Sequence, residues 1–432
     1  MCRAGRIRIR LIYVITLLMY IAISDCFGLV DFSLLMPGEL YDVIFVFAFF
    51  ALTVHLIRYP RLKFSFHKII LLPFLTLLSI AVVEMVGLQI EGTQSILTSI
   101  SVVRELLFLS IIIVYTNMDY DGQKLIKMLI ILDVIAVIVY ITEMIHGGPI
   151  VRSDIHSRGI YETLAGHRVW RCWVYSPVFS LFTIPYLLMH IFKKEKVFKT
   201  KKMDKLIFVI ILSGEIAKLG RTTLIAILLM IFLAYLYVDK LDLTRFIRKT
   251  LKMIMIGIAL SFVVFILFNG LFRRMFDGIL MILNVMDPNY RGTLAVRMSA
   301  ISLRLRYIRE NSCAWFGLGP LHRDYPLIIN AQDMANRGVL CADSAYATFL
   351  LRYGIIGTLM YVSGCLMNFI RLKKANTYTS YAVSFWLLAI LIAGVGGYDA
   401  WGKHTLLIVG ILFALCIRER HGRMIYHDMD RP

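Results

Sequence analysis

Charged residues are scarce in this chain of 432 residues, at only 17%, against about 25% in ordinary soluble domains. Hydrophobic residues reach 59%, above the roughly 45–50% typical of such domains, and the mean hydropathy is +0.75. Long uncharged runs recur from one end of the sequence to the other. This composition excludes a soluble globular enzyme and a disordered chain. It predicts an all-α protein that crosses a membrane many times.

Motifs for common cofactors are also missing. The chain contains no CxxC or HExxH pattern, no P-loop and no GxGxxG, so nothing indicates a nucleotide, a flavin or a structural metal site. We therefore expect no cofactor and no metal. Among the seven cysteines, Cys172, Cys313 and Cys341 fall in segments predicted to face outward, where a disulfide is permitted. A Cys313–Cys341 bridge and free buried thiols both stay open, because connectivity cannot be deduced from sequence.

Apolar windows predict twelve membrane spans. The first, from residue 11 to about 30, is long and is followed by no small-residue cleavage site, which favours a span over a signal peptide. The run at 206–238 is too long for one crossing of about 20 residues. Lys218, Gly220 and Arg221 interrupt it, which predicts two spans with a tight turn. The other spans are expected at 40–57, 69–90, 96–115, 125–146, 174–192, 253–271, 344–370, 380–395 and 402–417.

Basic residues orient these spans. With both termini in the cytoplasm, cytoplasmic segments hold 29 basic residues and the short outer loops 31–39 and 91–95 hold none, as the positive-inside rule requires. A smaller outer loop is expected at 147–173. The predicted organisation is nine spans over 1–271, a large outer loop over 272–343, and three spans with a cytoplasmic tail over 344–432.

Lysine is absent from both of the longer outer segments. All thirteen of their basic residues are Arg, whereas sixteen of the 18 Lys lie in predicted cytoplasmic segments. Arg carries a planar, permanently charged fork that binds phosphate through two donors. This pattern favours an outer site for a polyanionic ligand, with adhesion to anionic lipid headgroups as the alternative. The residues are Arg152, Arg158, Arg168, Arg171, Arg273, Arg274, Arg291, Arg297, Arg304, Arg306, Arg309, Arg323 and Arg337.

An amphipathic helix is predicted inside the large outer loop. Residues 297–309 alternate apolar and basic side chains at helical spacing, which is typical of a helix resting on a membrane surface. A Phe-Gly-Leu-Gly-Pro stretch follows at 316–320. The apolar side of the helix is expected to carry Val296, Ile301, Leu305 and Ile308.

Three segments, in order, resemble the O-antigen polymerase and O-antigen ligase superfamily of bacterial polysaccharide assembly. LSGEIAKLGRTTLIAILL at 212–229 is similar to the family's small-residue–Arg–Thr turn between two spans. VRMSAISLRLRYIRENSCAWFGLGP at 296–320 is similar to its Arg-led helix and Phe-Gly-x-Gly turn. DSAYATFLLRYGIIGTLMYV at 343–362 is similar to its signature of an aromatic followed by Gly-Ile-x-Gly. The resemblance covers roughly the C-terminal half of the chain.

The resemblance implies a glycosyltransferase in the bacterial cytoplasmic membrane. Its donor would be a glycan on undecaprenyl pyrophosphate, and its acceptor a lipid-linked repeat unit on the outer face. The polymer would be an O-antigen, a capsule or an exopolysaccharide, with a flippase and a chain-length regulator as implied partners. The ligase branch has a His where this chain has Asp343, which favours a polymerase. The alternatives are an O-antigen ligase and a multi-span transporter or flippase of lipid-linked sugars.

Arg residues are the candidates for binding the pyrophosphate, because charge accumulates on this group as it departs. Arg221 and Arg297 fall on the resembling segments and come first. Arg304, Arg323 and Arg352 come second. The alternative for Arg221 is snorkelling at a helix end, and for Arg304 a solvated or lipid-touching face.

An acid–base group is needed to deprotonate the acceptor hydroxyl. Asp343 is the first candidate, although it is equally suited to cap the next helix. His322 comes second and His167 third.

Several charged residues fall inside predicted spans, where an ionisable group indicates function by default. We interpret Arg104 as the ion-pair partner of Glu84 on the preceding span, next to Glu105. Asp133 lies in the fifth span. Arg352 lies two to three turns inside the tenth span, where it is expected to face a cavity for the lipid phosphate.

Overall fold

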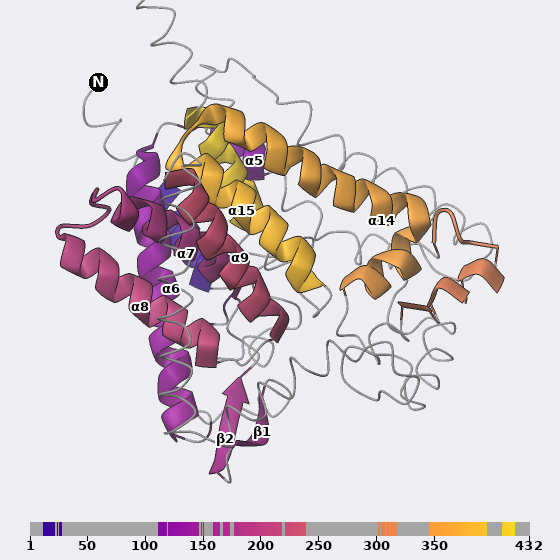
Figure 1. The fold of residues 1–432 in the computed structure, drawn as a ribbon, viewed down its shortest axis with the longest axis horizontal. Helices are drawn as coiled ribbons and strands as arrows, with labels where there is room; N and C mark the ends of the chain where they lie inside the picture. Colours follow the sequence, from indigo (N-terminus) through magenta and orange to yellow (C-terminus); the bar gives the residue numbers. More distant parts are fainter. Residues whose placement is uncertain are drawn as a thin grey trace, which may run out of the picture.

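The computed structural model is mostly helical (Figure 1). The structure describes residues 12–21, 24, 26–27, 111–118, 120–146, 148, 150, 159–164, 167–172, 177–217, 221–238, 301–302, 304–306, 308–310, 312–317, 345–394 and 408–419. Helix predominates in these residues, as the composition predicts. One two-stranded hairpin departs from the all-α expectation.

The long helices coincide with predicted spans. The first group comprises α6 (Gly122–His146), α7 (Pro177–Phe192), α8 (Lys201–Ala217) and α9 (Arg221–Val238). The C-terminal part contributes α14 (Ala345–Leu372) and α15 (Tyr378–Ala393). Shorter elements are α5 (Ile111–Asn117), the 3-10 helix η4 (Lys373–Ala375) and helical residues 12–21 and 408–419. The predicted division of 206–238 is confirmed, since α8 ends at Ala217 and α9 begins at Arg221.

Local sequence explains where these helices begin. The Asp121 carboxylate accepts hydrogen bonds from the amides of Gln123 and Lys124 at 3.0 and 3.2 Å, which caps α6. α15 begins with a capping box, in which the side chains and amides of Thr377 and Ser380 bond reciprocally at 3.0 and 3.1 Å.

Two described helices are long and apolar enough to cross a membrane, Gly122–His146 and Phe349–Ala375. Shorter apolar helices occur at Ile12–Ile21, Phe179–Phe192, Thr223–Val238 and Tyr378–Ala393. The predicted total of twelve spans is not confirmed. The windows at 40–57, 69–90 and 253–271 lie outside the described residues.

Large apolar side chains are exposed in stripes along three helices. The stripes consist of Ile131, Ile135 and Ile138 on α6, Ile225, Leu228 and Phe232 on α9, and Leu359, Leu366 and Ile370 on α14. Spacings of three, four and seven residues put side chains on one face of a helix. Such surfaces are unusual on soluble proteins and ordinary against lipid.

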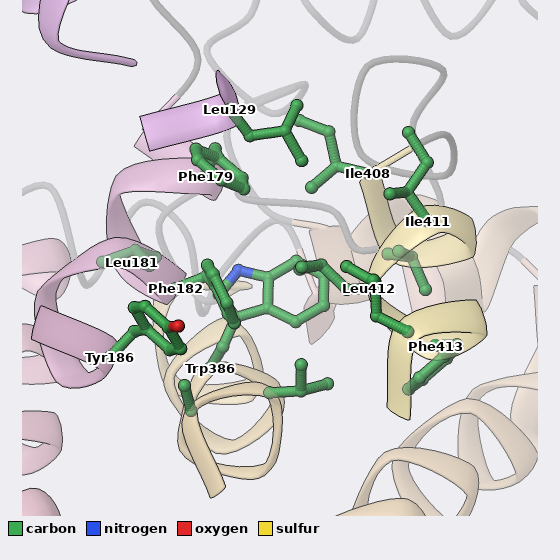
Figure 2. Close-up of a cluster of buried hydrophobic side chains, with 14 of the residues drawn as sticks. Leu129, Phe179, Leu181, Phe182, Tyr186, Trp386, Ile408, Ile411, Leu412 and Phe413 are labelled. Atoms are coloured by element: carbon green, nitrogen blue, oxygen red, sulfur yellow. The ribbon is translucent and has the colours of Figure 1, made fainter. Parts of the chain in front are cut away.

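The core lies between α6, α7, α15 and residues 408–419. Trp386 is fully buried there, surrounded by Phe182 of α7, Leu129 of α6 and Leu412 (Figure 2). The rings of Phe182 and Tyr186 stack with centroids 5.5 Å apart. Between helices in lipid, close packing rather than removal of apolar surface from water drives association. This interdigitated core therefore fixes the arrangement of the bundle.

One end of the bundle collects segments that the charge pattern places in the cytoplasm; we call it the basic end (residues 118–124, 193–202, 373–379 and 418–419). Hydrogen bonds of 2.7 Å connect Tyr378 to Glu195 and Thr379 to Glu419, and one of 3.0 Å joins Tyr13, on the helix at 12–21, to Asp121. Helices α7 and α14 therefore end at the basic end, and α6, α8 and α15 begin there.

Arg418 joins two of these segments. Its guanidinium donates to the carbonyls of Met118 and Tyr120, and it lies 4.0 Å from the centroid of the Tyr120 ring. Burial raises the pKa of Tyr120, and the neighbouring Arg418 charge partly opposes that shift. Arg418 thus ties the C-terminal helix to the start of α6.

A β-hairpin lies beside α6 (Figure 1). Strands β1 (Gly159–Leu164) and β2 (His167–Cys172) pair antiparallel, with Leu164 opposite His167. His167, the third acid–base candidate, is the first residue of β2 within the outer loop expected at 147–173.

Candidate functional site

α14 is broken in two at Gly354. This residue has φ 61° and ψ −163°, a backbone conformation that is essentially restricted to glycine. The rings of Phe349 and Tyr361 stack across the break with centroids 4.4 Å apart, although twelve residues of straight helix would separate them by about 18 Å. Residues 345–353 therefore fold back toward residues 355–372, as the bent orange helix in Figure 1 shows.

The break corrects the expectation of one continuous span at 344–370. Residues 355–372 are about 27 Å long at 1.5 Å per residue, which nearly matches a hydrocarbon core of about 30 Å. The first segment instead leads to the end of α15, where the Tyr346 hydroxyl donates to the carbonyl of Leu391. Arg352 accordingly lies two residues before the break, near the end of the first segment of α14.

The turn at 313–317 docks against this break, backbone to backbone. The amides of Ile355 and Ile356 donate to the carbonyls of Ala314 and Trp315 at 2.9 and 3.1 Å. Amides in the first turn of a helix have no acceptor within the helix, so the turn supplies acceptors for the helical segment that follows Gly354. We call this contact the glycine clamp (residues 314–317 with 354–356).

Two glycines make the close approach possible. A Cβ on Gly317, whose φ is 80°, would lie 2.6 Å from backbone atoms of Arg352, Tyr353 and Gly354. A Cβ on Gly354 would lie 2.5 Å from backbone atoms of Trp315 and Gly317. Side chains that meet fixed backbone cannot move aside, so only glycine fits either position.

A short helix leads into the clamp, with helical residues at 301–302, 304–306 and 308–310. It ends at Ser312, which has φ 58°. The Ser312 amide donates to the carbonyl of Arg309 at 3.1 Å, and the Cys313 amide to that of Ile308 at 2.7 Å. This is a Schellman cap. It fixes the direction in which the chain leaves the helix and enters the clamp.

The buried face of this helix differs from the predicted one. Ile308 is buried as expected, but Leu305 is exposed and Arg304 is buried, with only 9% of its surface exposed. Position 304 thus takes the place on the inner face that was predicted for position 305. A buried position was not among the alternatives proposed for Arg304. A buried guanidinium is costly unless charged or hydrogen-bonding groups surround it, and Arg304 is not without a partner in the folded chain.

Other cations adjoin the clamp. Arg306 and Arg309 are exposed on the short helix, and Arg352 is half-buried just before Gly354. Among the described residues, none of these three has an ion-pair partner. The helix that carries Arg304, Arg306 and Arg309 leads into the turn of the clamp, and Arg352 directly precedes its other half. Sequence reasoning named Arg306 and Arg309 only as outer cations, and the docking of the turn that follows them against residues 354–356 carries no local signal.

The remaining site candidates are placed only in part. Arg221 is the first residue of α9, and its side chain is outside the described set. The predicted roles of Arg297, His322, Arg323 and Asp343 fall on residues that lie outside the described part of the chain. The same holds for Cys341, Glu84, Arg104 and Glu105. Cys313 forms no disulfide in the structure.

Asp133 is buried in the middle of α6. Its Oδ1 accepts a hydrogen bond from the hydroxyl of Ser180 in α7 at 2.8 Å, and both side chains are fully buried. The sequence identified Asp133 as an intramembrane charge but gave no partner for it. This contact fastens α6 to α7.

Within the described ranges, no three His, Cys, Asp or Glu side chains are arranged to hold a metal ion. No protein-family model matches the chain, and no curated protein matches it either. The functional assignment therefore depends on the glycine clamp and on the Arg residues of the two segments that it joins.

Proposed function

We propose that this chain is a polysaccharide repeat-unit polymerase of a bacterial cytoplasmic membrane. It transfers a growing glycan from undecaprenyl pyrophosphate to a lipid-linked repeat unit on the outer face. The bond between the anomeric carbon and the pyrophosphate oxygen breaks, and that carbon bonds to the acceptor hydroxyl oxygen. The hydroxyl proton passes to a base, and undecaprenyl pyrophosphate leaves with the bonding electrons.

The glycine clamp is the observation that carries this proposal. It joins the Phe-Gly turn of segment 296–320 to the Tyr-Gly-Ile-Ile-Gly stretch of segment 343–362. Both segments resemble the same family, and nothing in their separate patterns requires them to touch. Arg residues on the two joined segments supply positive charge, which stabilises a departing pyrophosphate.

Roles follow from position along the chain. Arg352, two residues before Gly354, and Arg304, on the helix that leads into the clamp, bind the pyrophosphate, with Arg221, Arg297 and Arg323 as further donors. Asp343, two residues before α14 in the sequence, is the proposed base, and His322 is the second candidate.

The basic end favours an enzyme over a transporter. A transporter of lipid-linked sugars must open on both sides of the membrane. Here the hydrogen bonds of Tyr13, Thr379 and Arg418 connect four separate segments across that end. An enzyme that works on the outer face has no need to break them.

Deleting the gene should leave single repeat units on the lipid A–core and remove the polymer ladder seen on gels. Complementation with Arg221→Ala or Arg297→Ala should fail to restore the ladder, and full rescue by both would remove these two residues from the site. Uncapped core with polymer on undecaprenyl pyrophosphate would instead establish a ligase. An unchanged glycan profile would contradict any role in this pathway and bring the transporter forward.

Arg352→Ala should lower the rate of polymerisation about 100-fold, the usual cost of losing one group that stabilises developing charge. The matched control is Arg371→Ala, on the same helix but in its last turn near the basic end. That variant should polymerise at the wild-type rate. Polymer formation by membranes with equal immunoblotted protein measures both, and equal loss in the two variants would refute a specific role for Arg352.

A further inference from the structure

Two aromatic side chains beside the clamp are exposed although their backbone is held firmly. Trp315 is 63% exposed and Phe316 is 50% exposed. The Trp315 carbonyl accepts from the Ile356 amide at 3.1 Å, and the Gly317 amide donates to the Cys313 carbonyl at 2.7 Å. The backbone on both sides of Phe316 is thereby fixed. In the described part of the chain, neither ring packs against another aromatic ring or a cation.

Large aromatic faces exposed on a rigid turn are typical of binding surfaces. One face of a pyranose ring presents several C–H groups, which carry a small positive charge. An aromatic face carries the opposite sign and packs against them. Since the turn is already ordered before a ligand arrives, such stacking costs little conformational entropy.

Positive charge on the helix that leads into the turn indicates the rest of the ligand. Arg306 and Arg309 are exposed on the preceding helix, and no described acidic group pairs with them. A sugar joined to a phosphate combines the two chemistries that this surface offers, a ring face and an anion.

We propose that Trp315 and Phe316 form a stacking platform for a sugar ring of the lipid-linked glycan, next to the phosphate-binding Arg residues. This inference rests on the proposed polymerase function and adds to it the residues that contact a sugar ring of the substrate. The competing explanation is that the two rings lie in the lipid headgroup region and anchor the protein there. Such anchors are built mainly from Trp and Tyr and need no fixed backbone. The platform includes Phe316. Its backbone is hydrogen-bonded to α14 through the Trp315 carbonyl and within the turn through the Gly317 amide, which favours the sugar.

Leucine substitutions distinguish sugar stacking from lipid anchoring, because Leu keeps the apolar volume and loses the flat ring. The protein is purified into nanodiscs of neutral lipid, and the probe is the lipid-linked repeat unit extracted from the deletion strain. Trp315→Leu should raise the KM for this probe about 10-fold, as loss of one stacking contact does, with kcat nearly unchanged. Phe316→Leu should act in the same direction. Trp315→Phe should restore most of the affinity.

The matched control is Phe232→Leu, which removes an aromatic ring 41% exposed on α9. It should leave KM unchanged. Melting temperatures in detergent verify that the variants are folded, and the rescue by Trp315→Phe does so independently.

Two outcomes overturn the platform, and they are distinguishable. Active Trp315→Leu and Phe316→Leu proteins with the wild-type KM would leave the polymerase in place and refute the platform, which would then be a lipid anchor. Absence of polymer with the wild-type protein and this probe would refute the polymerase and the platform together.

Discussion

Gly354→Ala should abolish the polymer ladder in a complemented deletion strain. The φ and ψ of Gly354 lie where an alanine is strained by about 1–3 kcal/mol. Its Cβ would also lie 2.5 Å from the carbonyl carbon and oxygen of Trp315, and backbone atoms cannot rotate away as a side chain can. Relief requires either opening the clamp or changing the bend of α14. Both changes displace Arg352 and the turn at 313–317 from one another.

Gly317→Ala should give the same loss, because its Cβ would meet the other side of the same contact. Gly394→Ala is the matched control. Its Cβ would lie no closer than 3.4 Å to the Tyr346 ring, an ordinary van der Waals distance, at the end of α15. For all three variants, the polymer ladder on gels of surface glycan is compared with the amount of membrane protein on immunoblots. A ladder of normal length from Gly354→Ala would show that the bend is dispensable for the reaction.

Helix positions were the most predictable feature. α6, α7, α9 and α15 lie within a few residues of the apolar windows that predict them, because a run of apolar residues is itself the signal for a span. The break in α14 gives no such signal. Glycine is tolerated inside apolar helices, and the acceptors that stabilise the bend come from Ala314 and Trp315, about 40 positions earlier.

The candidate site was predictable in its segments and not in its contacts. The resemblance drew attention to residues 296–320 and 343–362, yet only the folded chain shows that they meet at the clamp. Arg304 and Leu305 were assigned to the wrong faces because a short helical pattern fits two adjacent stripes about 100° apart. The hairpin was missed although only two residues, Ala-Gly, separate Leu164 from His167, a spacing typical of tight hairpins.

Arg418→Met should destabilise the protein strongly without shortening the glycan made by whatever protein persists. Methionine keeps most of the packing on the Tyr120 ring and removes the donors to the carbonyls of Met118 and Tyr120. Loss of charged hydrogen bonds and of the cation over the ring should lower the free energy of unfolding by about 2–4 kcal/mol.

Lys124→Met provides the comparison at the same end of the bundle. The Lys124 Nζ lies 3.6 Å from Asp121 Oδ2, and both side chains are exposed, so this ion pair should contribute at most about 0.5 kcal/mol. Melting temperatures of the purified proteins in one detergent test the difference. A fall in both variants alike would mean that net charge at the basic end matters more than the Arg418 contacts. A lower melting temperature in Arg418→Met alone, with ladder length preserved, would show that Arg418 stabilises the bundle without taking part in the reaction. The chemistry would then stay assigned to the region around Gly354.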